Sequence, residues 1–182
     1  ELGGDRGGAY SRTGTRLTSI PRGYGRPALA AGKTRFVLYN RSGNELRVES
    51  RTQNLYSKTL ENSIYLCAMS DTGTLAVATD SADSTARLTV YTSTMSEQLH
   101  WDMTSAQGTP VRMAFAADSR RLAVAAVTSS AGQLQANLFV LSLAQGAPVQ
   151  LSSGDSVPQW LGWLNNDTVL AVYENCAVVY GP

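Results

Sequence analysis

The residue best suited to acid and base chemistry is His100, the single histidine of this 182-residue chain. An imidazole titrates near neutral pH, as general acid and base catalysis requires. Asp102 follows two positions later, so in a β-strand its carboxylate would share a face with the imidazole. A hydrolase would also need an activated serine, and the sequence has no Gly-x-Ser-x-Gly motif. We therefore interpret His100 as a polar contact at a strand edge or between repeated units, and predict no catalytic residue.

A second candidate for chemistry is the carboxylate pair Asp71 and Asp118. Glycoside cleavage uses two carboxylates a few ångströms apart. These two residues, however, stand at the same place in successive repeats, and Asn166 takes that place in the next repeat. A turn requirement repeats in this way, because Asp and Asn bond the local backbone of tight turns. We interpret all three as turn formers.

Metal ligands are sparse in this sequence. The polar loop Thr79 to Ser84 contains Asp80 and Asp83, but it lacks the glycine and the final glutamate of an EF-hand loop. Zinc would need more His and Cys ligands than one histidine and two distant cysteines supply. We predict no metal and no cofactor.

The two cysteines are predicted to be free thiols. Cys67 aligns with Ala114 and Gly162 in a slot for small residues, which indicates a buried thiol. Cys176 lies 109 residues away in another repeat, and a disulfide needs Cα atoms within about 7 Å.

Two tryptophans, Trp160 and Trp163, are candidates for stacking against a ligand. Their odd spacing in a strand predicts that the rings point to opposite faces. Trp163 shares the expected buried slot of Phe115, which leaves Trp160 more exposed. An exposed indole can stack on a sugar or a peptide, whereas packing between repeats is the alternative, which we favour.

The elements that position these residues come from a repeat. The tripeptide Leu-Ala-Val occurs at Leu75 to Val77, at Leu122 to Val124 and at Leu170 to Val172, at spacings of 47 and 48. A polar turn precedes each copy, and a segment of alternating apolar and polar residues precedes each turn. Alternation of period two predicts strands with one face buried. Each unit therefore opens with a strand, a turn and a strand.

The first strands align by their apolar residues. Ile64, Leu66 and Ala68 match Val111, Met113 and Phe115, and Leu66 and Ala68 also match Leu161 and Trp163. Third strands are predicted at 87–91 and 134–141, and fourth strands at 97–101 and 148–152, with very little helix. Residues 34–48 and 10–17 are expected to form further hairpins.

Antiparallel units of four strands, repeated about every 47 residues, are typical of a β-propeller. We predict an all-β fold, a partial propeller with about four blades. A flexible Gly-rich leader is expected at 1–8 and a single propeller-like domain at 9–182. The expected blades are 9–31 (partial), 32–63, 64–110, 111–157 and 158–182 (partial).

The hairpins of form Asp-x-x-(Arg/Thr)-Leu-Ala-Val resemble those of WD40-like and YVTN-like propellers, although the Gly-His and Trp-Asp dipeptides of true WD40 repeats do not recur. The segments Tyr24 to Leu29, Phe36 to Asn44 and Leu55 to Lys58, in this order, resemble an uncharacterised domain-of-unknown-function family of propeller-like proteins from Gram-positive bacteria. The resemblance implies a propeller outside the cytoplasm, held in the full-length protein by a membrane anchor that this chain lacks. It supplies no activity and no site residue.

Composition and charge narrow the functional classes. A content of 43% hydrophobic and 16% charged residues is that of a globular protein and excludes disorder throughout. Residues 1–58 hold nine Arg and two Lys against four acids, a net charge of +7, and residues 59–182 hold four Arg against ten acids, a net charge of −6. The arginines are scattered singly rather than clustered, so we expect no nucleic-acid partner; a nucleic-acid binder would show affinity that falls steeply with salt.

Closure of the ring is the remaining question. Four to eight blades normally close a propeller, and an open arc exposes strand edges. We therefore expect either further blades or a homo-oligomer to complete the ring. The leading hypothesis for function is a non-enzymatic scaffold that binds a protein, peptide or glycan outside the cytoplasm. The alternative is a propeller enzyme of the quinoprotein or lyase type, whose active site would need blades that this chain lacks.

Overall fold

A computed structural model describes residues 2–3, 6–10, 13–14, 16–21, 24–130 and 132–181. Every regular element among these residues is a β-strand, and the strands form five antiparallel sheets. No helix in this part of the chain has the length and apolar character needed to cross a membrane. The predicted all-β class is confirmed.

Each sheet is a meander, in which every strand pairs with the next one along the chain. We number the sheets 1 to 5 in chain order. Sheet 1 contains β1 (Leu2–Gly3), β2 (Arg6–Tyr10) and β3 (Arg16–Pro21). Sheet 2 contains β4 (Pro27–Ala31), β5 (Phe36–Asn40), β6 (Glu45–Glu49) and β7 (Asn54–Thr59). Sheet 3 contains β8 (Ile64–Met69), β9 (Leu75–Thr79), β10 (Ala86–Tyr91) and β11 (Glu97–Met103). Sheet 4 contains β12 (Thr109–Phe115), β13 (Arg121–Ser130), β14 (Gln133–Ser142) and β15 (Pro148–Gly154). Sheet 5 contains β16 (Trp160–Trp163), β17 (Val169–Val172) and β18 (Ala177–Tyr180).

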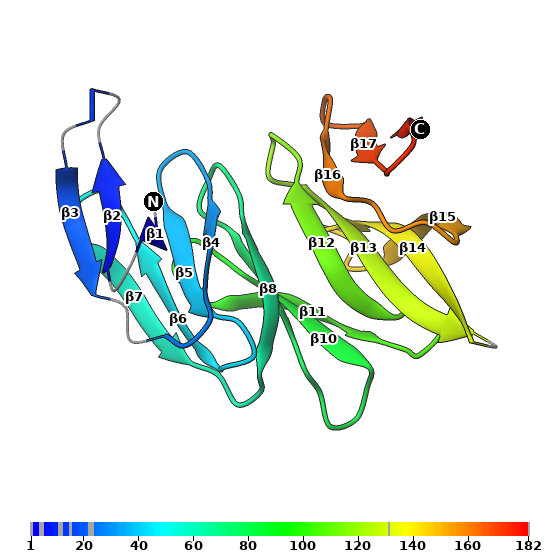
Figure 1. Cartoon of the computed structure of the whole chain (residues 1–182), viewed down its shortest axis with the longest axis horizontal. Helices are drawn as coiled ribbons and strands as arrows, with labels where there is room; N and C mark the ends of the chain where they lie inside the picture. Colours follow the sequence, from blue (N-terminus) through cyan, green and yellow to red (C-terminus); the bar gives the residue numbers. More distant parts are fainter. Residues whose placement is uncertain are drawn as a thin grey trace.

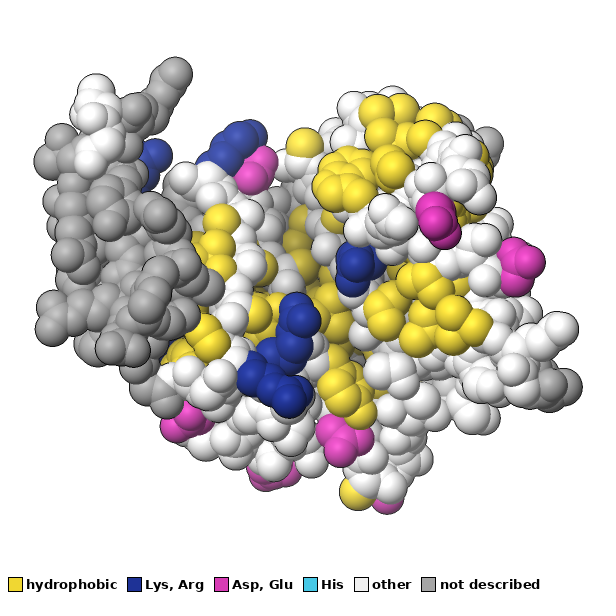
Figure 2. All heavy atoms as spheres, viewed as in Figure 1, with side chains coloured by type: hydrophobic (Ala, Val, Ile, Leu, Met, Phe, Trp, Pro, Cys, Tyr) yellow, Lys and Arg dark blue, Asp and Glu magenta, His cyan; other side chains and the backbone are white. Residues whose placement is uncertain are grey.

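The sheets stand side by side around their first strands (Figure 1). Strand β8 packs against β4 and β12, and β12 packs against β16. Sheets 2 to 5 therefore share three buried apolar interfaces, each built from the facing side chains of two neighbouring sheets. On the face seen in Figure 2, the surface is hollowed in the middle, and apolar side chains line its floor.

The second strand of each unit carries the Leu-Ala-Val repeat, but the third copy is displaced by one residue. Leu75 and Leu122 pair with the last residues of β8 and β12, whereas Val169, not Leu170, pairs with the last residue of β16. The structural period is therefore 47 in both steps. A shift of one residue turns every side chain to the other face. Val169 and Ala171 consequently pack against sheet 4, and Leu170 points the opposite way.

The alignment of the first strands also needs a correction of one residue. Five residues, 70–74, separate the paired ends of β8 and β9, but six, 116–121, separate those of β12 and β13. Cys67 is therefore equivalent to Met113 and Leu161, which all face the preceding sheet. The slot for small residues holds Ala68, Ala114 and Gly162 instead. The prediction that matched Leu66 to Met113 and Ala68 to Phe115 was wrong because the second turn is longer.

Two predicted boundaries also differ from the structure. Strand β4 begins at Pro27 and pairs with β5, so the second unit begins there and not at 32. Strand β12 begins at Thr109, two residues before the predicted boundary at 111. Of the expected flexible leader, residues 2–3 and 6–8 belong to β1 and β2, and residues 1, 4 and 5 lie outside the described residues.

Candidate functional site

The predicted acid and base pair does come together, on the outermost strand of sheet 3. His100 Nδ1 lies 2.9 Å from Glu97 Oε1, and its Nε2 lies 3.9 Å from Asp102 Oδ2. Asp102, however, binds Arg87 through two hydrogen bonds of 2.6 and 3.1 Å. These bonds lower the pKa of the Asp102 carboxyl, so this carboxylate is committed to the guanidinium rather than to the imidazole. The cluster is exposed at the rim of the sheet.

The carboxylates Asp71 and Asp118 lie in the turns that join first and second strands. Asp71 forms an ion pair of 2.7 Å with Lys33 of the neighbouring sheet. Asp118 accepts a hydrogen bond of 3.0 Å from the backbone N–H of Arg120, which closes its own turn. The side chain of Asn166 accepts a bond of 3.0 Å from the backbone N–H of Asp118, so one turn holds the next. A turn bond is shown for Asp118, whereas the side chains of Asp71 and Asn166 link their turns to a neighbouring sheet.

In the polar loop after β9, the Asp80 carboxylate is bonded within the protein. Asp80 accepts hydrogen bonds from the Tyr65 hydroxyl at 3.0 Å and from the backbone N–H of Ser81 at 2.9 Å. Within the described residues, no three His, Cys, Asp or Glu side chains are grouped so as to hold a metal ion.

Both cysteines are free, with Cys67 buried and Cys176 exposed. Burial raises the pKa of the Cys67 thiol well above its usual range. Trp163 is held by a hydrogen bond of 2.8 Å from its indole N–H to the Ala114 carbonyl. Trp160 is 51% exposed, and its ring covers Gly162 so closely that an added Cβ would overlap it. The two rings therefore point to opposite faces, as predicted.

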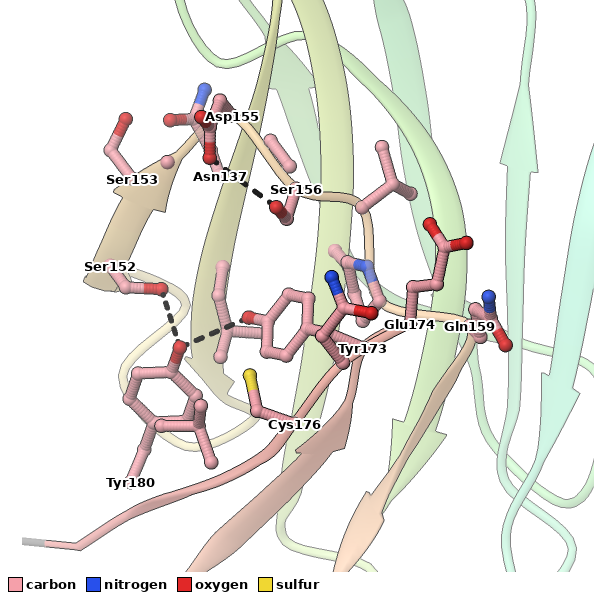
Figure 3. A pocket seen from close by; sticks show the side chains of 18 residues that line it. Asn137, Ser152, Ser153, Asp155, Ser156, Gln159, Tyr173, Glu174, Cys176 and Tyr180 are labelled. Atoms are coloured by element: carbon pink, nitrogen blue, oxygen red, sulfur yellow. Dashed lines mark hydrogen bonds between the residues drawn. The ribbon is translucent and has the colours of Figure 1, made fainter.

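A pocket of about 510 Å³ lies between sheets 4 and 5 (Figure 3). Strands β14 and β15 form one wall, β18 forms the other, and two loops, residues 155–159 and 173–176, complete the rim. Asn137 forms part of the floor and is 3% exposed. Its amide donates to the carbonyls of Ala106 and Gln107 at 3.0 and 3.2 Å, and its oxygen accepts from Gln150 at 3.2 Å. These bonds run to residues outside the pocket lining, and those that the amide donates tie β14 to the loop before β12.

A chain of hydroxyl groups crosses the pocket. Ser152 Oγ donates to Tyr180 Oη at 3.3 Å, and Tyr180 Oη lies 3.0 Å from Tyr173 Oη. Three hydroxyls carry three protons but share two bonds, so within the described residues one tyrosine O–H remains available as a donor. Burial and the bond to Tyr180 raise the pKa of Tyr173, which keeps this phenol protonated.

The charges on the pocket wall have one sign. Asp155 and Glu174, both exposed, lie on the two rim loops, and no Lys or Arg lines the pocket. Asp155 accepts a hydrogen bond of 3.3 Å from the Ser156 hydroxyl, and neither carboxylate forms an ion pair within the described residues. Arg112 approaches from outside, where its Nε donates to the Gln159 carbonyl at 3.1 Å. The pocket therefore offers hydroxyl donors, two aromatic side chains and uncompensated negative charge.

A second hollow, of about 410 Å³, lies where the first strands of sheets 2 to 5 converge. Most of its lining residues have apolar side chains, among them Met113, Phe115 and Trp163, but more than half of its exposed surface is polar. The acid at its rim, Asp71, is already neutralised by Lys33. No charged side chain of this lining is left without a partner, so we regard the pocket between sheets 4 and 5 as the better candidate site.

The sequence did not point to this pocket. Tyr173, Tyr180 and Ser152 belong to no motif, and Asp155 and Glu174 are single acids in polar loops. The repeat gives no signal for them either, since Tyr180 stands where sheet 4 has Leu141 and sheet 3 has another tyrosine, Tyr91. Cys176 was noticed only as a thiol, although it lines the same pocket.

Comparison with solved structures identifies the fold. The complex of KlAtg21 with the coiled-coil of AgAtg16 matches with a TM-score of 0.69 and 10% identity, covering 93% of this chain and 56% of that one. The WD40 domain of Pan2 from Neurospora crassa matches with a TM-score of 0.63 and 10% identity, covering 94% and 54%. A protein from Lactobacillus plantarum matches with a TM-score of 0.64 and 15% identity, covering 100% and 62%.

These likenesses show the fold, a β-propeller-like arrangement of the WD40 kind, as predicted. The chain spans 54 to 62% of the length of the three proteins. No curated protein matches the sequence. The pattern of one protein family, described as a family of unknown function (DUF5711), matches residues 5–181, and the chain belongs to this family.

Proposed function

We propose that this protein is a non-enzymatic scaffold that binds a segment of a partner protein in the pocket between sheets 4 and 5. The observation that carries the proposal is the pocket itself, with an available tyrosine O–H and two carboxylates that form no ion pair within the described residues. Binding sites are concave, with a few polar groups that orient the ligand. The solved complex of a protein of this fold with a coiled-coil supports the same kind of use.

The state of the acid and base groups favours binding over catalysis. His100 is bonded to Glu97 at an exposed sheet edge, away from both hollows, and Asp102 is bonded to Arg87. A reaction centre needs such groups to converge on one cavity. We infer that the chain works by presenting a surface, not by turning over a substrate.

The experiment is a selection of binding peptides from a displayed random library, run beside a glycan array. Ser156→Trp would fill the pocket with an indole, and Gln98→Trp on the exposed edge strand β11 is the matched control. We expect selected peptides to bind the native protein and the Gln98→Trp variant, and to lose affinity for Ser156→Trp. The proposal is wrong if the selected peptides bind the native protein, Ser156→Trp and Gln98→Trp with equal affinity. It is also wrong if the native protein binds glycans on the array but selects no peptide.

We also propose that the scaffold works outside the cytoplasm, as the family resemblance implies. Fractionation of the source cells, followed by protease treatment of intact cells, tests this. Full protection of the protein in intact cells, together with its recovery in the cytoplasmic fraction, would contradict the proposal.

A further inference from the structure

The rim of the pocket carries charge that nothing in the described residues neutralises. Most acids in the neighbouring sheets have a basic partner or a structural bond: Asp71 has Lys33, Asp102 has Arg87, and Asp167 has Arg121. Asp155 and Glu174 differ, because neither forms an ion pair although both line a concave site. Carboxylates at the edge of a low-dielectric hollow raise the local concentration of cations.

The aromatic side chains add to this preference. Figure 3 shows the ring of Tyr173 in the middle of the pocket, with Glu174 on one side of the view and Asp155 on the other. Aromatic faces attract ammonium and guanidinium groups. The same principle already operates in this molecule, where Lys58 Nζ lies 4.3 Å from the ring centroid of Tyr91. Acids and a phenol ring around one hollow favour a cationic group.

We propose that the pocket between sheets 4 and 5 binds a lysine or arginine side chain from an extended segment of the partner protein. The cation lies between Asp155 and Glu174, and the available tyrosine O–H donates to a backbone carbonyl of the segment. This inference rests on the proposed function and specifies its ligand. A glycan fits less well, since a neutral sugar would leave both carboxylates uncompensated.

The test uses small probes that reproduce the side chains alone. Butylammonium and propylguanidinium are titrated into the ¹⁵N-labelled full chain, and butanol, butyrate and N-acetylglucosamine serve as neutral, acidic and sugar probes. We expect the two cations to shift the amide signals of the two rim loops, residues 155–159 and 173–176. Added salt should weaken this binding, because partly exposed charges are screened.

Charge variants then assign the effect. Each of Asp155→Asn and Glu174→Gln should weaken the cations about two- to five-fold, the effect of a partly exposed ion pair. The matched control is Glu61→Gln with Asp83→Asn, two exposed acids outside the pocket, which should leave binding unchanged. All four positions are exposed, so melting temperatures should be those of the native protein.

The outcomes separate this inference from the proposed function. The inference is wrong if the cations shift no amide signal of the rim loops. It is also wrong if the double variant Asp155→Asn, Glu174→Gln binds the cations with the same affinity as the native chain. If N-acetylglucosamine shifts the same amide signals, the ligand of the pocket is a sugar and the inference of a cationic ligand is wrong. If selected peptides still lose binding to Ser156→Trp in either case, the proposed function stands and only the ligand chemistry fails.

Discussion

Two interfaces of this molecule occupy the same place in the repeat and are packed differently. Between sheets 3 and 4, large side chains interdigitate, and Trp101 meets Phe139 edge to face at 5.2 Å between centroids. Between sheets 4 and 5, fewer apolar side chains are buried, and Tyr173 and Tyr180 bring hydroxyls into the gap. Sheet 5 has three short strands where sheet 4 has four longer ones, and the pocket lies between these two unequal sheets. The repeat builds the frame, and the departure from it builds the site.

The largest effect should follow from breaking the denser interface. Leu122 is fully buried between sheets 3 and 4, and Leu122→Ala leaves a cavity among close-packed neighbours. We expect a loss of about 2–5 kcal/mol of unfolding free energy, measured by urea denaturation followed by circular dichroism. The control is Leu134→Ala, because Leu134 is 52% exposed and should change stability by less than about 0.5 kcal/mol. Equal losses in the two variants would show that the interface is not the main source of stability.

A sharper comparison uses two neighbouring alanines of β13 that face opposite interfaces. Ala126 lies in the dense interface, and Ala125 lines the pocket; both are fully buried. Ala126→Val should cost about 1–3 kcal/mol because a packed interface has no room for the added methyl groups. Ala125→Val can direct them into the pocket and should change stability by less than about 0.5 kcal/mol. Similar costs for both would mean that the pocket closes in solution.

The hydroxyls in the looser interface make a smaller, pH-dependent contribution. The pKa of Tyr173 is raised in the folded state, while a tyrosine in the unfolded chain ionises near pH 10. Above about pH 10 the unfolded state therefore loses its proton first, and the unfolding free energy falls as the pH rises. This fall should be less steep in Tyr173→Phe, whose phenyl ring cannot ionise.

The measurement is urea denaturation of both proteins at pH 8 and at several alkaline values, with the comparison made by difference so that the other titrating groups cancel. Parallel curves for native protein and variant would show that Tyr173 titrates normally. Tyr56→Phe is the matched control, since this tyrosine of sheet 2 is also partly buried but lies outside the pair of Tyr173 and Tyr180, and its replacement should leave the slope unchanged.

The fold was predictable because its information is periodic. Alternating apolar residues and polar turns located the third strands at 86–91 and 133–142 to within a residue. Register was less accessible, since one extra residue in the turn 116–121 shifted the alignment of Cys67 and of the whole of β8. Alternation of period two locates a strand, but it does not determine how many residues the neighbouring turn contains, and the register depends on that number.

The candidate site was less predictable because its residues follow no periodic pattern in the sequence. Its walls come from sheets 4 and 5, and the hydroxyl of Ser152 meets that of Tyr180 across 28 positions of sequence. Such a contact has no local signature, and residues that break a repeat are invisible to a search for the repeat. The motif-based candidates, His100 and Asp71, proved to be engaged in contacts of their own.

The smallest effect, and the most direct comparison, concerns the two thiols, which report on two interfaces without any mutation. Cys67 is 7% exposed in the interface between sheets 2 and 3, whereas Cys176 is exposed and lines the pocket. Thiolates are the reactive form, and burial both shields Cys67 and raises the pKa of its thiol. A disulfide reagent should therefore modify Cys176 at once and Cys67 only as the protein unfolds, with no change in melting temperature after the first reaction. Equal rates in the native protein would mean that the interface between sheets 2 and 3 opens as readily as the pocket.

A bound peptide should slow the reaction of Cys176 alone, because the pocket wall that carries this thiol would then be covered.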